Sequence, residues 1–160
     1  MDAADTETLR AMLAGQQVAS LATLHKGEPA VSMVPFALLP RGAGMVIHVS
    51  RLASHTADML NHPVVSLLVI APPVPGAMAQ ATPRVAIAGQ ARQCLADDPG
   101  HAAARLAYLD RFPESAPMFG FGHFSLFVIT PDAVRLITGF GKAHSLAAAA
   151  FAQALANAAA

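Results

Sequence analysis

The most constraining feature of this sequence is a succession of short apolar segments, each ended by residues that favour turns. The first two segments, residues 18–25 and 29–39, flank the turn signal Lys26-Gly27. Segments this closely spaced pair as antiparallel strands, because parallel strands need much longer connections. The other predicted strands are residues 45–49, 64–70, 84–94, 124–129 and 133–137, with a tight turn at Thr130-Pro131-Asp132 between the last two. About seven strands in one small domain predict a closed or partly closed barrel.

Short helices are predicted beside these strands. Apolar residues at helical spacing indicate an N-terminal helix within residues 1–16, which Gly15 ends. Residues 64–70 are continuously apolar, which is typical of a fully buried strand, and Gly89 indicates a β-bulge. The other predicted helices are residues 53–61, a segment from Asp98 to Phe112, and the alanine-rich residues 145–160. The sequence shows no domain boundary, so residues 1–160 are predicted to form a single domain.

Composition limits the classes of partner. Hydrophobic residues make up 54% of the chain and charged residues 12%, and ten acidic residues balance ten basic ones. A chain with no net charge has no field that favours nucleic acid or an anionic membrane surface, and its many apolar residues predict an oligomer. No run approaches the roughly 20 apolar residues of a membrane span, and the acidic N-terminus does not resemble a secretory signal. We therefore expect a cytoplasmic protein without a membrane partner.

The segment Met45–Leu60 carries the clearest chemical signal. A strand passes directly into a helix there, and the junction holds Ser50, Arg51, Ser54, His55 and Thr56. Hydroxyl groups and cations at the start of a helix suit a phosphate group, because the first turn has unpaired N–H groups. The alternative is that Ser54 is only a helix cap.

Other polar residues are less decisive. His48, His55 and His62 are seven residues apart, and seven helical residues span about 10.5 Å, so no metal site is expected. Arg84 and Lys142 are either surface charges or further partners of the same anion. Cys94 is the only cysteine, which excludes a disulfide framework within the chain.

Several segments together resemble the FMN-binding split-barrel family related to pyridoxamine 5′-phosphate oxidase. They are VASLATLHKGEPAVSMVPFAL from residue 18, IHVSRLASHTADMLNHPVVSLLV from residue 47, RVAIAGQA from residue 84, RLAYLDRFP from residue 105 and GFGKA from residue 139. The pattern is most similar to the HugZ/HutZ-like subgroup, some members of which bind and degrade haem. The resemblance implies a mainly β (α+β) fold: an antiparallel split barrel of about six to seven strands with flanking short helices.

The resemblance also implies a homodimer with FMN in a groove at the interface. The residues implied to contact the cofactor are Ser32, Met33, Val34 and Pro35 beside the flavin ring, His48 on the next strand, Ser50, Ser54, His55 and Thr56 around the phosphate, and the cations Arg84 and Lys142. No residue is implied as catalytic.

The function expected from this resemblance is that of an FMN-dependent oxidoreductase of unknown substrate. Residues 30–36 carry no basic side chain, which argues against vitamin B6 as that substrate. The first alternative is a haem-binding or haem-degrading protein with His123 or His144 as the iron ligand. The second is a dimer that binds a cofactor without catalysis.

Overall fold

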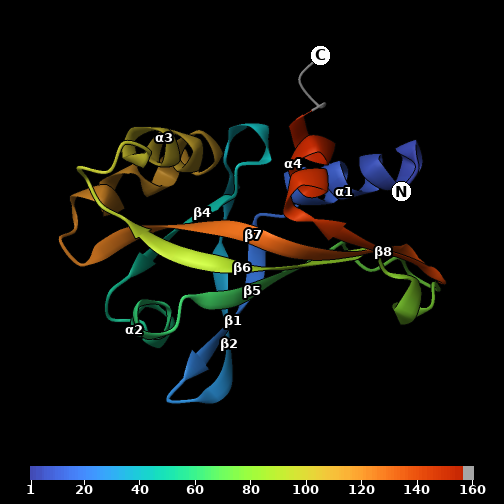
Figure 1. The fold of residues 1–160 in the computed structure, drawn as a ribbon, viewed down its shortest axis with the longest axis horizontal. Coiled ribbons are helices and arrows are strands. Elements are labelled where there is room, and N and C mark those ends of the chain that lie inside the picture. The colour runs from blue at the N-terminus through green and yellow to red at the C-terminus, as the bar shows by residue number, and fades with distance from the viewer. Residues whose placement is uncertain (157–160) are drawn as a thin grey trace.

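The computed structural model describes residues 1–156, which form one antiparallel eight-stranded sheet with helices at its ends (Figure 1). The strand order is β2-β1-β5-β6-β7-β4-β3, and β8 pairs with β7 outside this path. The strands are β1 (Val18–His25), β2 (Glu28–Pro35), β3 (Ala37–Leu38), β4 (Met45–Ser50), β5 (Val64–Ile70), β6 (Arg84–Cys94), β7 (Phe124–Gly139) and β8 (Lys142–Ala147).

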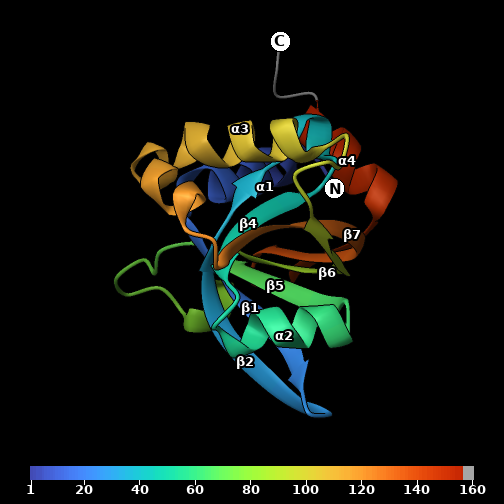
Figure 2. The same cartoon turned by 90° about the vertical axis from the view of Figure 1, so that its left-hand side faces the viewer.

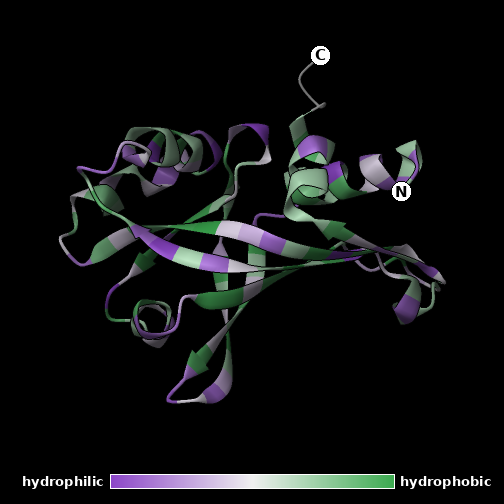
Figure 3. Ribbon diagram, viewed as in Figure 1, coloured by the Kyte–Doolittle hydropathy of each residue, from purple (hydrophilic) through white to green (hydrophobic). Residues whose placement is uncertain are grey.

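The sheet curls into a barrel whose two ends meet. β2 and β3 are the first and last strands of the path, yet only Phe36 separates them in the chain. The main core lies inside this curl, and Leu21, Ile47, Leu67 and Ile87 have no exposed side-chain surface there. Polar and apolar residues alternate along β6 (Figure 3), as expected for a strand with one buried face. The predicted fold class is therefore confirmed.

Within residues 1–156, four α-helices pack around the barrel: α1 (Ala3–Gly15), α2 (Ser54–Asn61), α3 (His101–Arg111) and α4 (Ala148–Ala156). α1 and α4 lie above the sheet and α2 below it (Figure 1), and they contribute Leu9, Phe151 and Met59 to the core. α3 lies across the outside of β4 (Figure 2), where Tyr108 is the largest side chain of a second buried cluster. None of the helices within residues 1–156 combines the length and apolarity required to cross a membrane.

Local sequence patterns predicted several elements correctly. β1, β5 and β6 have the predicted bounds, and the register between β6 and β7 shifts at the predicted Gly89 bulge. The prediction that residues 64–70 are buried on both faces was wrong. Buried and exposed positions alternate along β5, because only one of its faces is turned into the barrel.

The predicted turn at Thr130-Pro131-Asp132 does not exist. β7 continues through these residues, and Pro131 lies opposite Gly89 in the ladder with β6. A Cβ atom at Gly89 would lie 2.2 Å from the carbonyl oxygen of Thr130, so glycine permits the two strands to approach at this bulge. The bulge accommodates a proline that cannot donate to the ladder, and the strand remains continuous.

The C-terminal helix is shorter than predicted. Residues 145–147 belong to β8, because they pair with residues 133–135 of β7, and α4 begins only at Ala148. Residues 157–160 of the predicted helix lie outside the described residues. The predicted strand 29–39 is interrupted at Phe36, whose side chain enters the core, and α3 begins at His101 rather than at Asp98.

Candidate functional site

The barrel has a split between β2 and β4, and most of the predicted cofactor residues border it. β4 pairs with β7 over its whole length, but with β3 only at Met45 and Val46, so its remaining edge is unpaired. β2 is the outermost strand on the other side and pairs only with β1. β2 and β4 approach each other here without forming a ladder. The split therefore has one free strand edge on each side.

On the β2 side, the predicted residues offer mainly backbone groups. Val34 points into the core, Met33 is 63% exposed, and the shielded Ser32 hydroxyl has no hydrogen-bond partner within the described residues. The outer edge of an outermost strand carries unpaired N–H and C=O groups. This edge could hydrogen-bond the rim of a flat heterocycle.

The turn between β4 and α2 holds the predicted phosphate-binding residues, but several of its groups are already engaged. The Thr56 hydroxyl is buried and donates to the Ser50 carbonyl oxygen at 2.7 Å. The Ser50 hydroxyl accepts from the Leu52 amide at 3.2 Å. Ser54 is the first residue of α2 and is exposed, whereas the cap position is Ala53. The interpretation of Ser54 as the helix cap was therefore wrong, and its hydroxyl is available to a ligand.

A buried carboxylate of α2 holds this helix against β1. The buried Asp58 carboxylate accepts from the Thr23 hydroxyl at 2.9 Å and contacts Nδ1 of His25 at 2.8 Å. These hydrogen bonds outweigh the opposing effect of burial and keep the pKa of Asp58 below its usual value. Burial lowers the pKa of His55, with the Asp58 charge opposing that shift. A neutral His55 adds no positive charge to the turn.

Arg84 and Lys142 do not reach this turn within one chain. Arg84 pairs with Ile137 of β7, whereas Ser50 pairs with Phe124 at the other end of the same strand. Thirteen residues of strand correspond to roughly 40 Å. The Arg84 guanidinium instead donates to the carbonyl oxygens of Gln80 and Thr82. Lys142 pairs with Gly139 at the same far end of β7.

His48 lies under α3 in an aromatic environment that sequence reasoning did not reveal. Its side chain is 5% exposed and stacks on Phe119, with ring centres 3.9 Å apart and planes inclined by 10°. Burial lowers the pKa of His48 to about 4, so its ring is neutral at pH 7. Its Nδ1 atom has no hydrogen-bond partner within residues 1–156.

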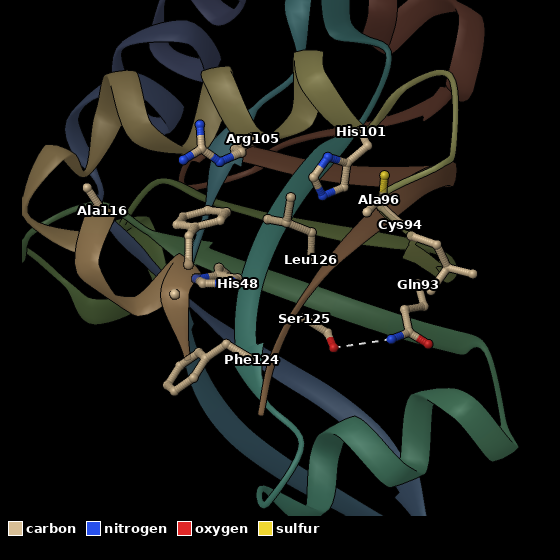
Figure 4. Close-up of a pocket in the computed structure, with 13 residues that line it drawn as sticks. His48, Gln93, Cys94, Ala96, His101, Arg105, Ala116, Phe124, Ser125 and Leu126 are labelled. Atoms are coloured by element: carbon tan, nitrogen blue, oxygen red, sulfur yellow. Dashed lines mark hydrogen bonds between the residues drawn. The ribbon is translucent and has the colours of Figure 1, made fainter. Parts of the chain in front are cut away.

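A cavity of about 530 Å³ adjoins His48 (Figure 4), and we call it the α3 cavity. Arg105 and His101 reach it from α3, while Leu126 and Ser125 belong to β7. No local pattern could have indicated this cavity, because its walls come from β4, the end of β6, α3, residues 116–120 and the start of β7. The complete lining is His48, Gln93, Cys94, Leu95, Ala96, His101, Arg105, Ala116, Phe119, Gly120, Phe124, Ser125 and Leu126.

The two predicted haem ligands differ in their surroundings. Nε2 of His144 lies 2.9 Å from the Asp5 carboxylate, which ties β8 to α1. His123 is exposed, and its ring stacks on Phe121 at 5.9 Å and approaches Phe124 at 5.1 Å. Its carbonyl oxygen accepts from the Arg51 amide, so it lies beside the turn at the end of the split. Within residues 1–156, no group of three His, Cys, Asp or Glu side chains could hold a metal ion.

Sequence comparison places the whole barrel in a known family. Residues 5–138 match the model of the pyridoxamine 5′-phosphate oxidase family. The chain belongs to this family. The match begins in α1 and ends in β7, so it includes both edges of the split and the turn before α2.

Individual relatives are described as haem proteins. Non-canonical heme oxygenase HOZ, a chloroplastic protein of Arabidopsis thaliana, is 35% identical over 140 residues, which are 86% of this chain and 41% of HOZ. A heme binding protein from Mycobacterium smegmatis has a TM-score of 0.82 at 31% identity, covering 95% of this chain and 61% of that one. HutZ from Vibrio cholerae, a heme storage protein, has a TM-score of 0.69 at 22% identity, covering 78% and 88%, and supports the fold alone. The chain spans less than two thirds of the length of the first two relatives.

Proposed function

We propose that this protein binds haem and that His123 is the iron ligand. The observation that carries this proposal is an exposed histidine clustered with two aromatic rings, Phe121 and Phe124, at the end of the split. Histidine nitrogen is a common axial ligand of haem iron, which supplies the redox chemistry. His144 is less suitable, because its Nε2 atom lies against the carboxylate of Asp5.

The surroundings of His123 suit a large apolar ligand with acidic groups. Phe121 is 49% exposed and Leu52, in the neighbouring turn, is 84% exposed, so both offer apolar surface to a porphyrin. The Arg51 guanidinium donates to the Gly122 carbonyl and lies beside this surface, where it could pair with a propionate. The relatives from Mycobacterium smegmatis and Arabidopsis thaliana support the same ligand by their descriptions.

Haem titration followed by visible spectroscopy tests the ligand. We expect a sharp Soret band for the wild-type protein and binding at least tenfold weaker for His123→Ala, with partial recovery on adding imidazole. His144→Ala is the matched control and should bind haem as the wild type does. An unchanged Soret band in His123→Ala would refute the assignment. Loss of the band on adding ascorbate in air would indicate haem degradation, whereas its persistence would favour binding without catalysis.

FMN is the second candidate, supported by the unpartnered Ser32 hydroxyl and the free hydroxyl of Ser54 at the two borders of the split. A flavin-dependent oxidoreductase of this kind would hold the ring along β2 and the phosphate at the start of α2. Quenching of FMN fluorescence measures its affinity. We expect Ser54→Ala to weaken FMN binding about tenfold, since one hydrogen bond to a charged group contributes about 1.5–3 kcal/mol. Equal affinity in both proteins would remove the phosphate assignment.

We also propose that the functional unit is a homodimer formed through the outer face of β2, β1 and β5. Paired residues place Val31 beside Ala22 and Ala22 beside Ser66, so small and apolar side chains form one continuous surface. Val31 is 73% exposed on it and Val64 is 59% exposed. Patches of this kind mark interfaces, and a second copy there could bring its own Arg84 toward the split.

Light scattering after size exclusion tests the dimer. Val31→Glu should convert the protein to a monomer, because the charge would be buried without a partner. Leu106→Glu, at a residue 61% exposed on α3, is the matched control and should remain dimeric. A monomeric wild-type protein or a dimeric Val31→Glu variant would contradict the proposal.

A further inference from the structure

We propose that the α3 cavity binds a small aromatic carboxylate, at a site separate from that of the haem. None of the residues proposed to contact haem around His123 lines this cavity except Phe124, which lies at its border. Its volume of about 530 Å³ is within the range of small-molecule pockets and far exceeds that of a single ion.

One wall of the cavity is positively charged. The Arg105 guanidinium carbon lies 5.0 Å from the centre of the Phe119 ring, which holds the cation over the cavity. His101, the first residue of α3, also lines the cavity (Figure 4). The positive end of the helix dipole therefore lies at the same wall as Arg105.

The residues that line the cavity include no acidic side chain within the described part of the chain. Asp98, which precedes α3, is occupied elsewhere: its carboxylate accepts from Arg92 at 2.6 Å and from the Leu95 amide at 2.9 Å. The positive wall is therefore not neutralised from within the cavity. A carboxylate is the ligand group that a guanidinium binds with two parallel hydrogen bonds.

The opposite wall suits a flat apolar body. Leu126 and Phe124 form it, whereas Phe119 lies under the Arg105 guanidinium and stacks on the neutral ring of His48. His48 closes the inner side of the cavity. It is nine-tenths buried there, and its Nδ1 atom is closed off from solvent. The ring therefore contributes a flat, uncharged surface to the cavity rather than a hydrogen bond.

Cys94 supplies a direct measurement of occupancy. It lines the cavity, its side chain is 4% exposed, and it is the only thiol in the chain. Burial raises the pKa of Cys94, so alkylation is slow and depends on access through the cavity. We choose benzoate as the probe and benzamide as its uncharged analogue. Benzoate should slow alkylation of Cys94 by iodoacetamide at least tenfold at saturation, and benzamide should have little effect.

Two arginine variants distinguish binding of benzoate in the cavity from a general effect of the charge of the protein. Arg105→Gln should weaken protection by benzoate at least tenfold, because it removes the cation. Arg135→Gln, an exposed residue of β7 that donates to Ser145, is the matched control and should retain protection. Equal protection by benzoate and benzamide would overturn the carboxylate assignment, and no protection by either would overturn the site. The comparison of the two probes on the wild-type protein needs no variant to fold.

Discussion

The neutral His48 ring predicts a specific sensitivity of this protein to acid. The pKa of His48 is lowered to about 4 by burial, against 6.5 for an exposed histidine. The unfolded chain therefore binds a proton between these values that the folded chain does not bind. By linkage, the stability associated with His48 is complete above pH 6.5 and is lost progressively as the pH falls toward 4.

The size of this effect follows from the two pKa values. Relative to a pH above both pKa values, the free energy of unfolding at pH 5 falls by RT ln[(1 + 10^1.5)/(1 + 10^−1)], which is about 2 kcal/mol. Solvent at the mouth of the α3 cavity screens part of this, so we expect about 1–2 kcal/mol. Arg105 lines the same cavity, and its positive charge acts in the same direction.

Urea unfolding at several pH values measures the effect directly. We compare the wild-type protein with His48→Leu, which has a similar volume and no titrating group. Between pH 7.5 and pH 5, the wild type should lose about 1–2 kcal/mol more than the variant, while the two should change in parallel between pH 7 and 8. Parallel curves over the entire range would refute the reasoning, because the buried histidine would then bind its proton equally in both states.

Three further predictions concern the framework of the site, each measured by urea or thermal unfolding. Met59→Ala should destabilise the protein by about 2–5 kcal/mol, because this side chain of α2 is 2% exposed in the core. Gly89→Ala should cost about 1–3 kcal/mol or more, since its Cβ would meet the Thr130 carbonyl, whereas Gly100→Ala, with open space around it, should have little effect. Arg111→Gln should cost about 1–3 kcal/mol, because the Arg111 guanidinium donates to three carbonyl oxygens at the end of α1. Stability equal to that of the wild type in the Met59, Gly89 or Arg111 variant would contradict the corresponding prediction.

Local patterns in the sequence determined most of the strands. The segments that became β1, β5 and β6 are bounded by proline, glycine or polar residues and rich in β-forming side chains, so their limits depended on nearby residues alone. The same holds for the end of α1 at Gly15 and the end of α2 before Pro63. The resemblance of these segments to a known family then identified the barrel, and the family match over residues 5–138 agrees with it.

Only the tertiary structure decided where local signals conflicted with pairing. Pro131 signals a turn, but the bulge at Gly89 lets β7 continue, and the helix-forming residues after Ser145 first pair with β7. In both cases the ladder of a neighbouring strand outweighed a local preference of about 1 kcal/mol or less.

The same distinction applies to the site. The hydroxyl-rich turn after β4 was visible because its residues are consecutive, whereas the separation of Arg84 from that turn depends on their positions at opposite ends of the sheet. The α3 cavity joins β4, β6, β7 and the α3 region, and its chemistry arises from burial: His48 is neutral because Phe119 and α3 exclude water from it. The sequence by itself determined which local elements form and which groups could bind a ligand. The packing of distant segments decided which of those groups meet and what charge they carry, because burial and distance are properties of the folded chain.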